Sequence, residues 1–154
     1  AHHGLLRHGE LRGLLRRLQM NRVVWYAPDQ DYGRKNSVFA PFFGVPAATI
    51  TATARIARSS GAAVIAISHF RRNDGSGYDI YFEPALSGYP SGDDVADATL
   101  TNAVLEAQIR RYPDQYLWMH RRFKSRPEGE ADLYKFRKKR KRRKPQPARS
   151  PDAR

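Results

Sequence analysis

Two carboxylates and an amide side chain lie together early in the chain, at Asp29, Gln30 and Asp31. They follow the apolar run 23–26 and Pro28, which has no N–H to donate and would end a strand. Polar groups at the carboxyl end of a buried strand are where open α/β sheets usually bind ligands. The pattern therefore predicts a ligand-facing turn, and a simple Asx-rich turn leaving a strand explains it equally well.

A second polar cluster, between positions 116 and 126, mixes aromatic rings with cations. Arg121 and Arg122 carry guanidinium groups that can bind phosphate or carboxylate through two hydrogen bonds. Trp118 and Phe123 suit a lipid headgroup boundary. A solvated cationic face over packed aromatics is an equally good interpretation. The full set is Tyr116, Trp118, His120, Arg121, Arg122, Phe123, Lys124 and Arg126.

His69 and Asp74 fit the spacing H-x-x-x-x-D, which several acyltransferases use for a general base and its carboxylate partner. His69 falls near the end of a predicted strand, however, and Asp74 precedes Gly75 in a tight-turn sequence. Hairpin geometry alone explains that Asp-Gly pair. We therefore interpret the pair as a decoy and assign no catalytic residue.

The amino-acid composition excludes several classes of functional site. The chain has 154 residues, enough for one domain with a core, and no cysteine, so disulfides and thiol nucleophiles are excluded. Its five histidines suggest no closed ligand set, so neither a metal site nor a cofactor is predicted. No apolar run approaches the roughly 18–20 residues that span a bilayer. The chain begins with Ala rather than Met, and we expect that the beginning of a longer protein is missing.

Most of the net charge of +13 is concentrated in a tail, residues 135–154, which has eleven Lys or Arg and one Asp. The tail has almost no apolar side chains after Phe136 and is predicted to be disordered. Such a run binds phosphates non-specifically. The body shows no base-reading motif, so a nucleic-acid-binding module is the alternative function rather than the favoured one.

Several elements must position these groups. Leucines at helical spacing predict a helix over 10–18 that packs on a sheet. Strands are predicted at 23–26 and 62–70, with a small-residue helix over 47–58 between them. A strand–helix–strand order gives a right-handed crossover and two parallel strands. Between positions 37 and 46, Pro41 and Pro46 argue against a regular central strand, so an extended aromatic loop is expected there.

The second half of the body continues this pattern. The turn sequence 73–77 predicts a hairpin whose second strand, 78–83, returns antiparallel. Asp93 or Asp94 should cap a helix running to about Tyr112, with Glu106 and Arg110 as an i,i+4 pair. The predicted fold class is α/β, with a mixed, mainly parallel sheet flanked by helices and a disordered basic tail.

Three stretches resemble one known family, the late acyltransferases of lipid A biosynthesis. They are W-Y-A-P-D-Q-D-Y-G, S-V-F-A-P-F-F-G-V-P-A-A-T and P-D-Q-Y-L-W-M-H-R-R-F-K-S-R-P-E-G. The resemblance runs from about Leu11 to Tyr134. It implies a partial glycerolipid-acyltransferase-like fold, with residues 1–134 as the C-terminal part of the acyltransferase domain and 135–154 as the added tail. The family's N-terminal membrane anchor and His/acid dyad would lie upstream of this sequence.

The resemblance also implies an activity. Such enzymes move a fatty acyl chain from acyl carrier protein to a hydroxyl of a Kdo-bearing lipid A precursor, at the cytoplasmic face of the bacterial inner membrane. The expected partners are therefore acyl carrier protein, the precursor and the anionic membrane surface. An inactive, membrane-peripheral remnant is a third possibility, because the dyad is absent. Expected substrate-binding residues are Asp29, Gln30, Asp31, Arg34, Arg121, Arg122, Lys124 and Arg126, with Phe39, Phe42 and Phe43 contacting the acyl chain.

Overall fold

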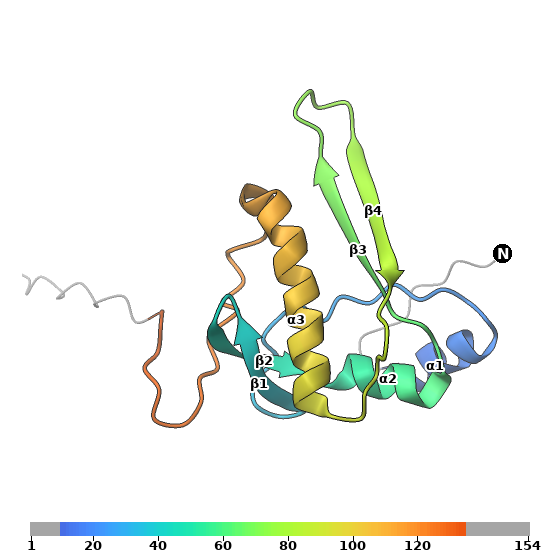
Figure 1. Ribbon diagram of the computed structural model, residues 1–154, viewed down its shortest axis with the longest axis horizontal. Helices are drawn as coiled ribbons and strands as arrows, with labels where there is room; N and C mark the ends of the chain where they lie inside the picture. The colour runs from blue at the N-terminus through green and yellow to red at the C-terminus, as the bar shows by residue number, and fades with distance from the viewer. Residues whose placement is uncertain (1–9, 135–154) are drawn as a thin grey trace, which may run out of the picture.

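The computed structural model describes residues 10–134 and combines three α-helices with two small antiparallel sheets in that range (Figure 1). In chain order the elements are α1 (Leu11–Gln19), β1 (Ser37–Phe42), β2 (Val45–Ile50), α2 (Ala52–Ser60), β3 (Ile65–Arg71), β4 (Tyr78–Ala85), α3 (Asp94–Arg111) and the short 3₁₀ helix η1 (Pro113–Gln115). The predicted tail, 135–154, lies outside the described residues.

Helix α3 is central, because it packs against β1, β2 and β3 (Figure 1). Its predicted N-cap is confirmed: the Asp93 carboxylate accepts the N–H groups of Val95 at 2.8 Å and Ala96 at 3.1 Å. These bonds satisfy donors that the first helical turn leaves without intrahelical acceptors. The predicted Glu106–Arg110 pair is also present, at 3.5 Å.

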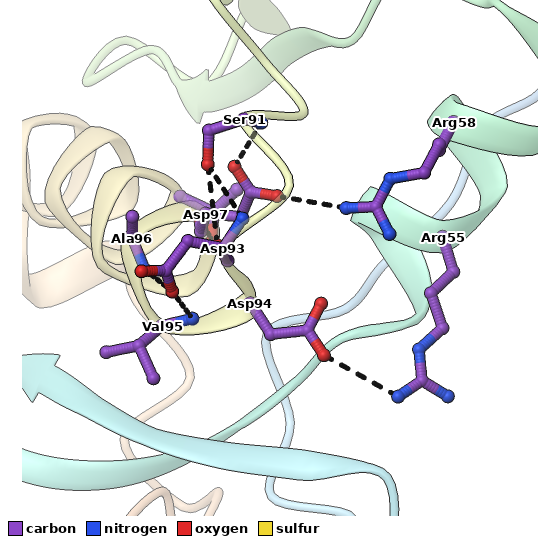
Figure 2. A network of polar contacts seen from close by, with 9 residues as sticks. Arg55, Arg58, Ser91, Asp93, Asp94, Val95, Ala96 and Asp97 are labelled. Carbon is purple, nitrogen blue, oxygen red and sulfur yellow. Dashed lines mark hydrogen bonds and ion pairs between the residues drawn. The ribbon is translucent and has the colours of Figure 1, made fainter.

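Two ion pairs connect the start of α3 to α2 (Figure 2). Arg55 lies 3.6 Å from Asp94, and Arg58 lies 3.9 Å from the buried Asp97. The other Asp97 oxygen accepts the Ser91 N–H at 2.8 Å, which ties the preceding loop to the helix. These polar contacts therefore hold the start of α3 to α2 and to the preceding loop.

The stretch predicted as an aromatic loop is instead the β1–β2 hairpin. Pro41 and Pro46 stand opposite each other in its register, and Phe42 pairs with Val45. Proline is tolerated here because each strand of a two-stranded sheet has an outer edge that needs no N–H. The connecting residues Phe43 and Gly44 both have positive φ, 48° and 75°, as a two-residue type I′ turn requires.

The helix predicted over 47–58 was partly wrong. Residues 47–50 of the predicted helix belong instead to β2, where Ala47 and Ala48 are buried against β1 and α3. The helix α2 begins only at Ala52. Gly61 then ends α2 in the left-handed conformation, at φ 68°. The small residues that suggested one close-packed helix therefore serve two elements.

The hairpin β3–β4 is confirmed, and Figure 1 shows it projecting away from the rest of the molecule. Its strands pair antiparallel, with Phe70 opposite Asp79 and Arg71 opposite Tyr78. Asp74 shapes the turn, since its carboxylate accepts the Ser76 N–H at 2.9 Å. That hydrogen bond lowers the pKa of the Asp74 carboxyl group below its ordinary value.

The predicted mainly parallel sheet was wrong, as was the strand at 23–26. That segment lies outside both sheets, with Val23 fully exposed and Trp25 73% exposed. The crossover argument failed because β2 takes up the start of the expected crossover helix and pairs with β1. Consequently β3 has only an antiparallel partner, β4, among residues 10–134.

The core is small and lies between the β1–β2 hairpin and α3. Phe42, Ala47 and Ile109 are buried there, surrounded by partly buried side chains of Phe43, Leu105, Tyr116 and Phe123. The predicted helix at 10–18 is confirmed as α1, but the expectation that it packs on a sheet was wrong: it packs mainly on α2 and has no fully buried residue. Within the described range, no helix has the length and apolar character needed to cross a membrane.

Candidate functional site

The acidic turn is held in place by the carboxylate of Asp31, which is 7% exposed. Its Oδ1 accepts the Gly33 N–H at 2.8 Å, and the left-handed φ of Gly33, 88°, lets the chain turn back. Ser125, distant in sequence, donates its backbone N–H to Oδ2 at 2.7 Å and its hydroxyl to Oδ1 at 2.9 Å. One buried carboxylate therefore joins the acidic turn to the cationic segment, residues 121–126.

Arg122 is the most buried member of the cationic segment, at 2% exposed. Its guanidinium donates to the Ala48 carbonyl at 2.7 Å, to Thr49 Oγ1 at 2.9 Å and to Asn102 Oδ1 at 3.2 Å. It also lies 5.2 Å from the centre of the Phe42 ring. This side chain therefore connects β1, β2 and α3 to the segment that carries it.

Electrostatics link the two acidic residues to this guanidinium. Burial lowers the pKa of Arg122, while the nearby Tyr116 and the carboxylates of Asp31 and Asp29 oppose that shift. Removing a cation from water is costly, and neighbouring negative charge offsets part of that cost. The carboxylates of the 29–31 turn therefore lie close enough to Arg122 to stabilise its charge.

Arg126 and Arg34 fix the two segments to the β1–β2 hairpin. Arg126 Nη1 donates to the Pro46 carbonyl at 2.5 Å, and Nη2 forms an ion pair with Glu130. Arg34 Nη2 donates to the Arg126 carbonyl at 2.5 Å and is exposed. The Pro46 carbonyl, on the outer edge of β2, thus has a side-chain donor, as half-buried carbonyls usually do.

Exposed cations surround this scaffold. Arg121 and Lys124 are both exposed, and the guanidinium of Arg121 stacks 5.8 Å from the Tyr134 ring. Gln30 and Asp29 are half-buried beside Asp31 in the chain. The site therefore offers charged groups to solvent while the buried guanidinium holds the backbone beneath them.

Tyr116 carries a buried hydroxyl that has no hydrogen-bond partner among residues 10–134. Burial, reinforced by the negative charge of Asp29, raises the pKa of Tyr116 to about 12. Its ring lies 6.4 Å from that of Phe42 and 4.9 Å from that of Trp118. The phenol is therefore neutral at physiological pH and packs as an aromatic side chain.

The three phenylalanines expected at an acyl chain differ in exposure. Phe42 is fully buried, whereas Phe39 and Phe43 are half-buried. Arg34 lies 6.0 Å from the Phe39 ring, and Arg110 lies 4.9 Å from the Phe43 ring. Of the three rings, only those of Phe39 and Phe43 are therefore accessible to a ligand.

Sequence reasoning missed Thr49, Asn102 and Ser125, which complete the hydrogen bonding of the site. Asn102 is 3% exposed and also donates to the Pro41 carbonyl at 2.8 Å. A signal was available, because asparagine is a poor helix former and this one falls in the middle of α3. Such a residue facing the core indicates a buried polar partner.

His69 and Asp74, judged a decoy from the sequence, lie on β3 and in the β3–β4 turn. His69 is exposed and its ring lies 5.9 Å from that of Tyr78. This hairpin is separate from the acidic turn and the cationic segment. The absence of a catalytic role for the pair stays a prediction.

Comparison with known proteins identifies strong similarity to one group of enzymes. The family model described as bacterial lipid A biosynthesis acyltransferase matches residues 4–125. The chain is 47% identical over 131 residues to a lipid A biosynthesis palmitoleoyltransferase of Escherichia coli, and 44% identical over 131 residues to the lauroyltransferase of the same organism. Each alignment covers 84% of this chain, and 42% and 43% of the respective relative. This chain therefore spans less than half the length of these relatives.

Proposed function

Because this chain belongs to the family of bacterial lipid A biosynthesis acyltransferases, we propose that it forms the acceptor-binding part of such an enzyme. The reaction would move a fatty acyl chain from acyl carrier protein to a hydroxyl of a Kdo-bearing lipid A precursor. The bond between Asp31 and Ser125 carries the proposal, because it places the acidic turn beside the cationic segment.

The acceptor is a phosphorylated, anionic glycolipid, and the exposed cations suit it. In this proposal Arg34, Arg121 and Lys124 contact its phosphate or carboxylate groups, since their side chains reach solvent. Arg122 and Arg126 are occupied by protein acceptors and hold the segment from beneath. Their contribution to binding would therefore be positional.

The acidic turn would serve the sugar. Asp29 and Gln30 are half-buried at its start, and their oxygens can accept hydrogen bonds from sugar hydroxyls. Phe39 and Phe43 would flank the acyl chain, with Phe42 supporting them from the core. These groups bind and orient the acceptor; none is assigned to proton abstraction.

The proton step would require a part of the enzyme beyond the matched region. A general base would remove the acceptor hydroxyl proton as its oxygen attacks the thioester carbonyl, and the thiol of acyl carrier protein would leave. By the family resemblance this base is the histidine of a His/acid dyad. The enzyme would act at the cytoplasmic face of the inner membrane, where its lipid substrate resides.

A chimera tests the proposal directly. The 131 matched residues of the E. coli palmitoleoyltransferase are replaced by those of this chain, and acyl transfer is measured with purified acyl carrier protein and precursor. The double substitution Arg121→Ala with Lys124→Ala should raise the KM for the precursor about tenfold or more, the effect of losing about 1.4 kcal/mol of binding. The KM for acyl carrier protein should stay unchanged.

A matched control removes two exposed cations elsewhere, Arg12→Ala with Arg16→Ala on α1. Its precursor KM should stay close to that of the parent chimera. Equal precursor kinetics in all three proteins would remove Arg121 and Lys124 from the acceptor site.

A further inference from the structure

The β3–β4 hairpin has one covered face and one open face. On the covered face, Phe70 packs 4.5 Å from the ring of Tyr112, and Arg111 stacks 5.4 Å from the Tyr81 ring. The opposite face, which we call the outer hairpin face, consists of Ile67, His69, Arg71, Tyr78, Ile80 and Phe82. Register places Ile67 opposite Phe82 and His69 opposite Ile80, so these side chains point the same way.

The outer hairpin face is mostly apolar and is exposed. Phe82 is 72% exposed, Tyr78 60% and Ile80 59%. Its one cation is Arg71, opposite Tyr78 at the end next to the polar tip formed by Arg72, Asn73 and Asp74. A membrane-binding surface would instead be rich in Lys and Arg, with several basic residues clustered beside the apolar ones. The composition therefore fits a protein partner better than a lipid surface.

The outer edge of β3 is closed at one point by a side chain that imitates a strand. The Arg71 N–H donates to Gln115 Oε1 at 2.7 Å, and Gln115 Nε2 donates to the Arg71 carbonyl at 3.1 Å. Successive residues of a strand turn their backbone groups to opposite edges. His69 and Ile67 therefore present theirs on the same edge as Arg71, and residues 10–134 supply no strand to pair with them.

An isolated two-stranded hairpin is marginally stable in water, and an open edge invites another strand. More than half of the E. coli palmitoleoyltransferase lies outside the region that this chain matches. We propose that a β-strand from that remaining part of the family's polypeptide adds to the outer edge of β3 and that its chain covers the outer hairpin face. The Gln115 amide marks where the added strand stops. This inference rests on family membership and not on the proposed reaction.

Amide hydrogen exchange tests the proposal, because strand addition protects outward-facing amides. Exchange at Ile67 and His69 is measured in the 154-residue chain alone and in the chimera. It should be roughly a hundredfold or more slower in the chimera, as expected when an exposed amide joins a stable sheet. Equally fast exchange in both proteins would overturn the proposal. Activity is not read, so a failure of the proposed reaction would leave this result interpretable.

The native relative provides a second measurement should the chimera fail to fold. In the full-length E. coli palmitoleoyltransferase, the amides aligned with Ile67 and His69 should be protected. Rapid exchange there would overturn the proposal independently.

Substitution of the face identifies the occupant. The unmatched part of the palmitoleoyltransferase is co-expressed with this chain, and Ile80→Glu should reduce their co-purification at least tenfold. Met119→Glu is the matched control, since Met119 is 89% exposed and lies outside the hairpin. Three results would count against the proposal: equal losses in both variants, a dimer of this chain that Ile80→Glu abolishes without affecting co-purification, or Ile80-dependent binding to phosphatidylglycerol vesicles alone.

Discussion

Ser125 engages both oxygens of the Asp31 carboxylate, with its N–H on Oδ2 at 2.7 Å and its hydroxyl on Oδ1 at 2.9 Å. Ninety-four positions separate the two residues in sequence. The contact therefore closes a long loop and sets the spacing between acidic turn and cationic segment.

Removing this carboxylate should destabilise the fold. Asp31→Ala leaves the backbone donors of Gly33 and Ser125 without their acceptor, so the free energy of unfolding should fall by about 2–3 kcal/mol in urea denaturation. Ser125→Ala keeps the backbone donor and should cost only about 1 kcal/mol. Glu128→Ala, at an exposed position, should stay within about 0.5 kcal/mol of the parent. A loss in Asp31→Ala no larger than in Glu128→Ala would contradict the role of the contact.

The shape of the Arg122 guanidinium should matter as much as its charge. Lysine cannot reach Ala48, Thr49 and Asn102 together with a planar fork, so Arg122→Lys should reduce the free energy of unfolding by about 2 kcal/mol. Arg121→Lys makes the same change at an exposed neighbour and should be nearly neutral. If thermal or urea unfolding showed the two variants to be alike, the buried hydrogen bonds would contribute nothing particular to arginine.

Alkaline pH should weaken the fold through Tyr116. Its folded pKa, about 12, lies above the ordinary value of 10.0, so folding favours the neutral phenol. The stabilisation is complete below about pH 10 and is lost as pH rises toward 12. Tyr116→Phe should therefore flatten the decline of the urea midpoint between pH 9.5 and 12 while changing little at pH 7, where it removes a buried hydroxyl without a partner among the described residues. An identical decline in both proteins would refute this assignment.

Helix α3 should be sensitive to its cap (Figure 2). Asp93→Ala removes the acceptor of two N–H groups and should cost about 1 kcal/mol in free energy of unfolding, whereas Asp93→Asn should retain most of the stability. Measured by urea denaturation at neutral pH, an equally large loss in Asp93→Asn would show that charge rather than capping is responsible.

The basic tail, outside the described residues, carries a prediction of its own. Residues 135–154 should strengthen binding to anionic vesicles by at most about 1 kcal/mol per basic residue near the surface. Sedimentation with vesicles containing phosphatidylglycerol, with and without the tail, measures this. Equal binding at low salt would dispose of it.

Local signals predicted the elements that local chemistry determines. The leucine spacing of α1, the Asp93 cap of α3 and the turn at Asn73, Asp74 and Gly75 each specify a backbone geometry within a few residues. These predictions needed no knowledge of what packs against them. The acidic turn and the cationic segment were singled out by residue type, and the structure joins them through the hydrogen bonds between Asp31 and Ser125, while their role in binding stays a prediction.

Pairing partners could not be predicted in the same way. The run 23–26 has the composition of a covered strand, but composition does not specify which segment would cover it. The β1–β2 hairpin was not predicted because its turn uses Phe43 and Gly44 rather than Asn-Gly, and because its two prolines, which argued against a strand, lie on outer edges where they are tolerated. The hydrogen bonds from Arg122 to Thr49 and Asn102 depend on that hairpin, so they could not be predicted once the hairpin itself was not predicted.

Phe43 has a consequence for how the molecule assembles. A bulky residue rarely adopts φ 48°, and here its N–H donates to the Glu106 carboxylate of α3 at 2.7 Å. We therefore expect the reversal between β1 and β2 to be unfavourable until the helix is present to hold it. A synthetic peptide of residues 36–51 should show no cross-strand nuclear Overhauser effects in water; a well-populated hairpin would mean that the turn forms unaided. If the turn does need the helix, the β1–β2 hairpin and α3, which form the two sides of the core, should fold together in one cooperative step.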